Sequence, residues 1–234
     1  MKKLSDSQRI PMFNQLILRD MIGEVTIVPG PADSCSVEIE VQDNLSAHFK
    51  FGVKDTRYVV QGPKAKNVST NNDVTTLYFD SSPAVVVISL PKIKITVPRE
   101  VLVDFAGRGL GRLTANGLNS AFRVKTNGQF ELSLEGTSDL DIETNGAALS
   151  TLKNVNGKLE VNSNGSGSIE ASGRFLDVDI SINGTGNGNI TGDCDDCDLS
   201  VNGMGMITYT GHVRGDLSKS ANPSFMCQVI TNLK

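Results

Sequence analysis

The sequence predicts an all-β fold: a single-stranded, right-handed parallel β-helix with about 19 residues per coil, preceded by an irregular β-rich N-terminal part. The first observation is an Asn-Gly pair that recurs with its glycines 18, 19, 19 and 19 residues apart. The pairs are Asn127-Gly128, Asn145-Gly146, Asn164-Gly165, Asn183-Gly184 and Asn202-Gly203. A fixed period near twenty residues is typical of solenoids, in which each coil buries its apolar face on its neighbours. The right hand follows from the usual hand of parallel crossovers.

The second observation is a column pattern before each glycine. Residues six and four positions before it are apolar: Phe122 and Val124, Leu140 and Ile142, Leu159 and Val161, Val178 and Ile180, Cys197 and Leu199. The residues between them are charged: Arg123, Asp141, Glu160, Asp179 and Asp198. Alternation with period two predicts a strand with one buried face, and the shared phase predicts that Ile142, Val161 and Ile180 stack in one core.

A second, shorter alternation follows each Asn-Gly and ends on a glycine or asparagine. These terminal residues are Gly136, Asn154, Gly173, Gly192 and Gly211. Glycine and asparagine both tolerate positive φ, so each coil is expected to turn at the Asn-Gly pair and again at this second position. The stacked asparagines either hydrogen-bond from coil to coil or serve only as turn formers.

Two other repeat folds fit less well. Leu140-Asp-Ile142-Glu-Thr-Asn145 resembles part of a leucine-rich repeat, but the flanking leucines and the helix-forming half are missing. A left-handed hexapeptide helix needs a period divisible by six, and nineteen is not.

We expect four segments along the chain. Residues 1–12 are predicted to be disordered, residues 13–102 to form the irregular β-rich N-terminal part or cap, residues 103–211 to form the regular coils, and residues 212–234 to form a C-terminal cap. An end coil needs covering because it presents unpaired strand edges. Within the N-terminal part, Asn67–Asp73 is predicted to be a polar loop and the apolar run Ala84–Leu90 to lie in the core near the first coil.

Composition excludes some function classes. The 234-residue chain has a net charge of −4 and no basic run, which argues against a nucleic-acid partner. No stretch is long and apolar enough for a membrane span. The N-terminus carries two lysines without the apolar segment of a signal peptide. The protein is therefore expected to be periplasmic or at the cell surface if a signal was removed, and cytoplasmic otherwise.

Few groups suggest chemistry. Cys194-x-x-Cys197 has the spacing of half a zinc site or of a redox pair, while Cys197 falls in a core column. The acidic group Asp193, Asp195, Asp196 and Asp198 has oxygen ligands suited to calcium, or is a solvated corner. His48 and His212 lack a nucleophile motif. We expect no catalytic, cofactor-binding or metal-binding residues, because the polar columns repeat rather than converge.

The residues also resemble a known family. The opening Phe13-Asn-Gln-Leu-Ile17, followed by Gly23-Glu-Val-Thr-Ile27, resembles the start of the head GIN domain of putative autotransporter adhesins. The run Ile93–Pro98, which leads to Gly107–Gly111, is similar to that family's entry into its repeats. The family also has a recurring G-x-G-x-I pattern, and three segments here resemble it: Gly165–Ile169, Gly186–Ile190 and Gly203–Ile207. The resemblance covers residues 13–229 and implies an exported or surface-attached β-helical protein of bacteria. Cys194-Asp-Asp-Cys197 is not part of that pattern.

The leading hypothesis is a non-enzymatic β-helical protein of the cell envelope or surface, a structural or adhesion module of unknown ligand, with a glycan or another surface component as partner. One alternative is an intracellular β-helical scaffold that polymerises through its ends, as bactofilin-like proteins do. Another is a polysaccharide-processing enzyme that uses the outward carboxylates of Asp141, Glu160 and Asp179.

Overall fold

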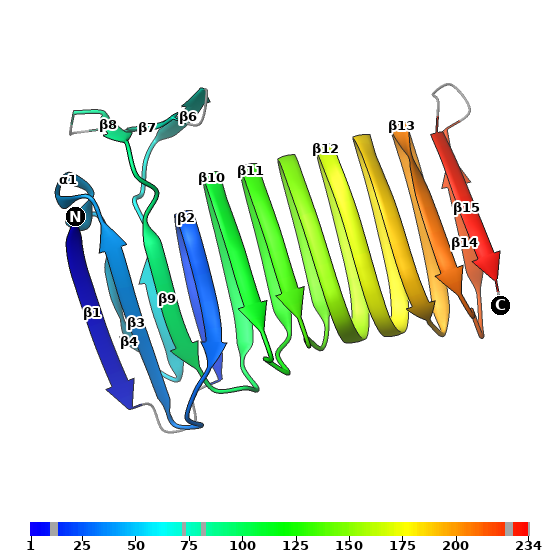
Figure 1. Cartoon of the computed structure of the whole chain (residues 1–234), viewed down its shortest axis with the longest axis horizontal. Coiled ribbons are helices and arrows are strands. Elements are labelled where there is room, and N and C mark those ends of the chain that lie inside the picture. Colours follow the sequence, from blue (N-terminus) through cyan, green and yellow to red (C-terminus); the bar gives the residue numbers. More distant parts are fainter. Residues whose placement is uncertain (10–13, 72–73, 81–82, 223–226, 234) are drawn as a thin grey trace.

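A computed structural model describes residues 1–9, 14–71, 74–80, 83–222 and 227–233 as an elongated, nearly all-β molecule (Figure 1). Strands account for 77% of the described residues and helices for 2%. The strands are β1 Lys2–Arg9, β2 Gln15–Pro29, β3 Ser34–Val41, β4 Lys50–Lys54, β5 Arg57–Gln61, β6 Asn67–Asn71, β7 Val74–Tyr78, β8 Val85–Val87, β9 Lys92–Val97, β10 Leu102–Asn116, β11 Phe122–Glu135, β12 Leu140–Asp193, β13 Asp196–Gly211, β14 Leu217–Ala221 and β15 Cys227–Leu233. A four-residue helix, α1, spans Asp43–Ser46.

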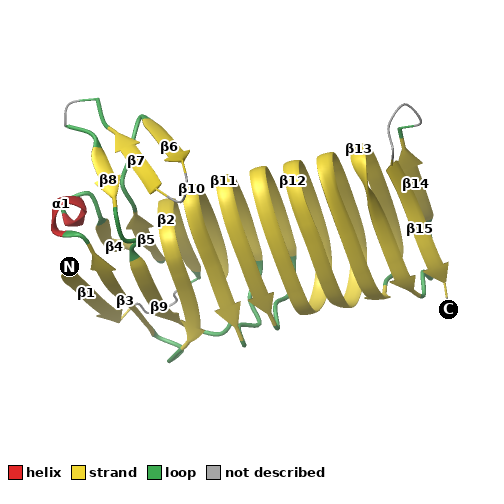
Figure 2. Cartoon of the chain, turned by 45° about the horizontal axis from the view of Figure 1, so that its top comes forward, coloured by secondary structure: helices red, strands yellow, loops and turns green. Residues whose placement is uncertain are grey.

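The stacked coils of β10 to β13 confirm the predicted parallel β-helix, with about six turns spaced about 19 residues apart (Figure 2). The pairing register is the one that the sequence columns predict. Asn127 lies opposite Asn145 between β11 and β12, and Asn183 lies opposite Asn202 between β12 and β13. The repeat of the sequence is therefore the repeat of the coil.

The interior of the coils is a set of apolar ladders. Ile142, Val161 and Ile180 are each at most 1% exposed, which confirms that they share one core. In the first coils, the residue two positions before the glycine is a buried threonine or serine instead of an apolar residue: Thr126, Thr144 and Ser163. Thr144 Oγ1 donates to Ser163 Oγ at 3.2 Å, so neighbouring rungs satisfy each other's polar groups.

The Asn-Gly glycines all have positive φ, as predicted. Their φ values are +131° at Gly128, +128° at Gly146, +142° at Gly165, +140° at Gly184 and +157° at Gly203. A Cβ at any of the last four would overlap the carbonyl oxygen of the glycine one coil earlier. Glycine is therefore needed both for its backbone angle and for the close approach of successive coils.

The asparagines act mainly within their own strands. Asn145 Nδ2 donates to Glu143 Oε1 at 3.3 Å, and Asn183 Nδ2 donates to Ser181 Oγ at 3.3 Å. A bond from coil to coil joins Asn222 Nδ2 to Asn202 Oδ1 at 3.0 Å. Among the hydrogen bonds of the described residues, Asn202 is therefore the one asparagine of the five pairs that is bonded to an asparagine of another coil.

The N-terminal part extends the wall of the solenoid. β2 pairs in parallel with β10 and with β9, and the antiparallel strands β3 and β1 follow. The prediction of a disordered segment over residues 1–12 is wrong for β1, because pairing with β3 satisfies its backbone. The Tyr58 hydroxyl also donates to Asp6 Oδ2 at 2.6 Å. Residues 10–12 lie outside the described part.

A three-stranded antiparallel sheet, β6-β7-β8, stands out beside the first coils (Figures 1 and 2). Two predictions fail here. The expected loop Asn67–Asp73 contains strand β6, since its polar residues pair with β7; residues 72 and 73 lie outside the described part. The prediction that Ala84–Leu90 lies in the core fails at Ile88, which is 85% exposed, because β8 is an edge strand with one buried face; Val87 is 3% exposed in the core, and Val85 and Leu90 pack against it.

At the other end, β14 and β15 continue the coils rather than fold over them. Both pair in parallel with β13, with Leu217 opposite Cys197 and Val229 opposite Ile207. In the described part of the expected C-terminal cap, β14 and β15 are thus a further rung, because they pair with β13 in the register of the repeat; residues 223–226 and 234 lie outside the described part. None of the described helical residues makes a segment long and apolar enough to cross a membrane.

Candidate functional site

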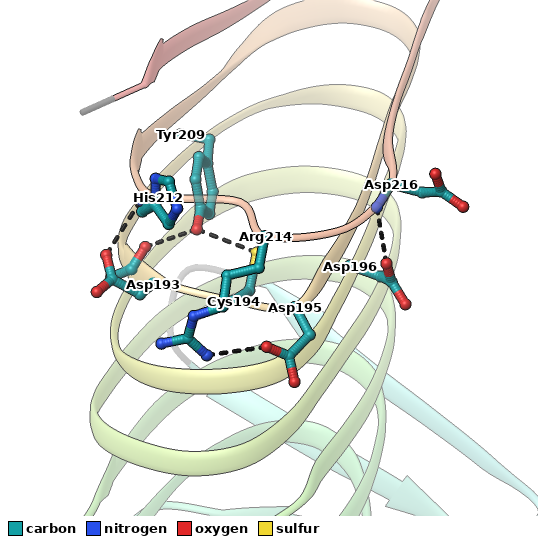
Figure 3. Close-up of polar contacts among 9 residues, drawn as sticks. Asp193, Cys194, Asp195, Asp196, Tyr209, His212, Arg214 and Asp216 are labelled. Carbon is teal, nitrogen blue, oxygen red and sulfur yellow. Dashed lines mark hydrogen bonds and ion pairs between the residues drawn. The ribbon is translucent and has the colours of Figure 1, made fainter.

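The corner between β12 and β13 carries the densest group of chemically active side chains (Figure 3). Here the chain leaves the second strand of one coil, turns at Asp195 and begins the next. The Cys194 backbone N–H donates to the His212 carbonyl at 2.9 Å, and the Arg214 N–H donates to the Cys194 carbonyl at 3.1 Å. These bonds place the Cys194 side chain inside the coil, where it is 0% exposed.

The two thiols of Cys194 and Cys197 are both free and buried. Burial, with a smaller contribution from the adjacent Cys194, raises the pKa of the Cys197 thiol to about 12. Burial also raises the pKa of Cys194, although a hydrogen bond with Tyr209 opposes this shift. Protonated, buried thiols are poor nucleophiles, and both side chains pack in the interior of the coil.

Tyr209 anchors the corner from the following coil. Its hydroxyl donates to the Gly192 carbonyl at 2.6 Å and lies 3.1 Å from Cys194 Sγ. The side chain is 0% exposed, and burial raises the pKa of its hydroxyl, so the phenol stays neutral. Tyr209 therefore links two coils through a polar contact in an apolar interior.

The aspartates of the corner are engaged by the next coil. Asp193 Oδ1 accepts the His212 N–H at 3.1 Å, and Asp196 Oδ1 accepts the Asp216 N–H at 2.8 Å. Asp195 Oδ1 pairs with Arg214 Nη1 at 2.9 Å (Figure 3). Within the described ranges, no group of three or more His, Cys, Asp or Glu side chains is placed to hold a metal ion.

The same use of a carboxylate recurs elsewhere in the repeat. Asp139 Oδ1 accepts the Lys158 N–H at 2.8 Å, across one coil. Sequence reasoning interpreted the acidic corner as a calcium site or a solvated corner and missed this contact. The sequence signal for these contacts is the spacing of about 19 residues, one coil, between each aspartate and the residue whose N–H it accepts.

The structure separates the two histidines. His48 lies in the N-terminal part, where its ring stacks on Phe79 with centroids 4.3 Å apart. His212 lies at the corner near the C-terminal end, beside Asp193. The two side chains do not meet at a common site.

A second candidate is the outer side of the strand that precedes each Asn-Gly, which we call the polar face. Its members share outward positions in the repeat and are Asp141, Glu143, Asn145, Glu160, Asn162, Asn164, Asp179, Ser181, Asn183, Asp198, Ser200 and Asn202. Parallel in-register strands place equivalent members about 4.8 Å apart. The result is a regular array of carboxylate, amide and hydroxyl groups.

The charges of the polar face change along the coils. Lys125 pairs with Glu143 at 2.6 Å, and this hydrogen bond lowers the pKa of Glu143. Further along, Asp179 lies opposite Asp198. Desolvation raises the pKa of Asp179, and the neighbouring Asp198 raises it further. Negative charge is thus concentrated toward the C-terminal coils, where it is suited to a cationic group or a bridging cation.

Comparison with solved structures shows a similar fold in a protein of Bacteroides fragilis. A "putative adhesin" of Bacteroides fragilis matches with a TM-score of 0.53 and 18% identity, over 98% of this chain and 97% of that one. A "putative lipid binding protein" of Parabacteroides distasonis has a TM-score of 0.45 and 15% identity over 97% and 96% of the two chains. A "putative adhesin" of Parabacteroides merdae has a TM-score of 0.42 and 13% identity over 100% and 95%.

No curated protein matches the chain. A family model described as "Putative auto-transporter adhesin, head GIN domain" matches residues 13–213, which include the N-terminal strands and the regular coils. This agrees with the resemblance found in the sequence motifs and with the solenoid that those motifs build. The chain therefore belongs to the "Putative auto-transporter adhesin, head GIN domain" family.

Proposed function

We propose that this protein is a non-enzymatic binding module of the bacterial cell envelope or surface, and that it attaches to a surface glycan through the polar face. The observation that supports the proposal is the register of that face, in which carboxylate, amide and hydroxyl groups repeat at the spacing of the strands. Membership of an adhesin-like family supports an extracytoplasmic location.

A repeated array favours an extended ligand. Each outward carboxylate or amide contributes little alone, because water competes for it and salt screens it. Several rungs that engage successive units of one polymer act together, and the contacts then reinforce one another. A polysaccharide with amino groups, or one bridged by calcium, suits the negative charge around Asp179 and Asp198.

The same arrangement disfavours catalysis. Hydrolysis of a glycoside needs two carboxyl groups in different roles on either side of one bond. On the polar face, Asp141, Glu160 and Asp179 occupy equivalent positions in successive coils and point the same way. We therefore propose binding without cleavage.

The test is binding to immobilised polysaccharides, neutral, acidic and amino-sugar-rich, with and without calcium. The informative variant is Glu160→Arg combined with Asp179→Arg, which reverses charge on two adjacent rungs. We expect it to weaken binding to the preferred polymer by about tenfold or more, or about 1.4 kcal/mol. Glu170→Arg, an exposed residue of the strand after the Asn-Gly pair, is the matched control.

Equal binding by the double variant and the Glu170→Arg control would exclude the polar face as the contact surface. Release of soluble sugar from any polymer would contradict the non-enzymatic assignment. In that case the loss of cleavage in Asp141→Ala or Glu160→Ala would identify the carboxylates involved.

A further inference from the structure

Two hollows lie on the outer side of the solenoid away from the polar face, where the strands that follow the Asn-Gly corners run. Both are lined by Glu24. The first, of about 560 Å³, is lined by β1, β3, β9 and β2. The second, of about 400 Å³, is lined by Glu24, by Leu90 and by four successive strands of the solenoid, at residues 110–112, 129–131, 147–149 and 166–167. The contributing strands lie side by side in Figure 1.

The first hollow is charged but balanced. Three lysines and three glutamates line it: Lys3, Lys92, Lys94, Glu24, Glu38 and Glu40. Lys3 lies opposite Glu40, Glu40 opposite Lys92, and Lys92 opposite Glu24. None of these six side chains forms an ion pair within the described part of the chain. Both signs of charge are therefore available to a ligand.

The row of alternating charge ends in an ion pair at the border of the second hollow. Glu24 lies opposite Arg112, and Arg112 lies opposite Glu131. Arg112 Nε and Nη2 both donate to Glu131 Oε2, at 2.9 and 2.6 Å. The next member of the row is Leu149, so the surface changes from charged to apolar within one strand.

The second hollow is apolar. Leu90, Leu110 and Leu149 contribute the apolar side chains of its surface, Phe130 lies buried beneath it, and Ala147 with Gly167 leaves space between them. Leu149 is 57% exposed, whereas the equivalent positions in other coils hold Arg112, Glu131, Ser168, Asn187 and Met206, of which only the last is apolar. An exposed leucine at a mostly polar position of the repeat indicates a binding surface rather than a requirement of the fold.

The dimensions of the two hollows favour an elongated ligand. The apolar hollow extends from β2 across four strand spacings to the coil of Gly167, which is about 19 Å at 4.8 Å per strand. This length suits a single hydrocarbon chain. A ligand whose chain lies over Leu110 and Leu149 would place its head group beside Glu24 and Lys92.

We propose that these joined hollows bind a single-chain amphiphile with a zwitterionic head group, one phosphate and one ammonium. The lysines and Arg112 attract the phosphate, and the glutamates attract the ammonium. A purely anionic or cationic head group would leave the opposite row of charges without a partner, at a cost in desolvation. This site is separate from the polar face, so its failure and the failure of glycan binding are independent results.

The test is calorimetry with three probes of equal chain length below their micelle-forming concentrations: dodecylphosphocholine, dodecyl sulfate and dodecyltrimethylammonium. We expect saturable binding of the zwitterionic probe, at least about tenfold tighter than that of either charged probe. Phosphocholine alone should bind far more weakly, because the apolar contact is missing.

Two variants examine the two ends of the site. Leu149→Ser should weaken binding of dodecylphosphocholine by about tenfold, and the control Leu176→Ser, an exposed leucine of another coil corner, should leave it unchanged. Lys92→Gln should reduce the preference for the zwitterionic probe, and the exposed control Lys153→Gln should not. The absence of saturable binding, or equal affinity in Leu149→Ser and the wild type, would overturn the proposal. Equal affinity for dodecyl sulfate would overturn the assignment of the head group.

Discussion

The glycine of the Asn-Gly pair is the position where a single methyl group should be most costly. At Gly165 the φ of +142° disfavours any L side chain, and a Cβ would lie 2.9 Å from the Gly146 carbonyl carbon and overlap its oxygen. Backbone strain of this kind costs about 1–3 kcal/mol. Forcing an extra methyl group into a close-packed contact costs a further 1–3 kcal/mol, roughly. Gly165→Ala should therefore lower the free energy of unfolding by about 4 kcal/mol. This is a large part of the total free energy of unfolding of a typical domain, roughly 5–15 kcal/mol.

Two other glycines separate these contributions. Gly117 has a φ of +72° but open space around its Cβ position, so Gly117→Ala should cost only the backbone strain, about 1–2 kcal/mol. Gly52 has neither a positive φ nor a neighbour within 4 Å, and Gly52→Ala should be neutral or stabilise by about 0.4–1 kcal/mol. Urea unfolding followed by circular dichroism measures all three. If Gly165→Ala loses no more stability than Gly117→Ala, the close approach of successive coils does not limit this position.

Three further perturbations follow from the structure. Val161→Asp places an unpaired charge in the central ladder and should cost several kcal/mol, on the order of 4, in urea unfolding, while Asp141→Asn on the outer side should be nearly neutral. Asp179→Asn should raise the melting temperature at neutral pH, because the pKa of Asp179 is raised in the fold and its ionised form therefore destabilises the folded state. The gain should vanish below about pH 3.9, where the carboxyl is protonated in both the folded and the unfolded state. A gain that persists at low pH would contradict this cause. Tyr209→Phe leaves a buried carbonyl without its donor and should lower stability by about 1–3 kcal/mol, whereas Tyr78→Phe, at a 45% exposed residue, should have no measurable effect.

The candidate site shows where sequence reasoning lost information. The period of the repeat placed Cys197 in the core correctly, because core columns recur in every coil. The same period did not reveal that Asp193 and Asp196 accept backbone N–H groups from the following coil. Such bonds depend on side-chain direction at an irregular corner, where neither composition nor alternation specifies the geometry.

The N-terminal part shows a similar limit. The strand β1 is polar along most of its length, so its sequence resembles a disordered segment. It is ordered through pairing with β3, whose residues lie about thirty positions later. The polar strand β6 is likewise formed by its pairing with β7. In both cases the backbone partner, rather than the side-chain pattern, provides the stabilising contacts.

The sequence by itself determined the coils, their register and the direction of the side chains within the coil strands. It did so because a repeated unit meets copies of itself, and one period then specifies every contact between neighbours. Only the tertiary structure decided the row from Lys3 through Glu40, Lys92 and Glu24 to Arg112, and with it the joined hollows. Those residues come from five strands spread over more than a hundred positions without a common period. Their proximity depends on how non-repeating strands pair, and that pairing is a property of the whole sheet.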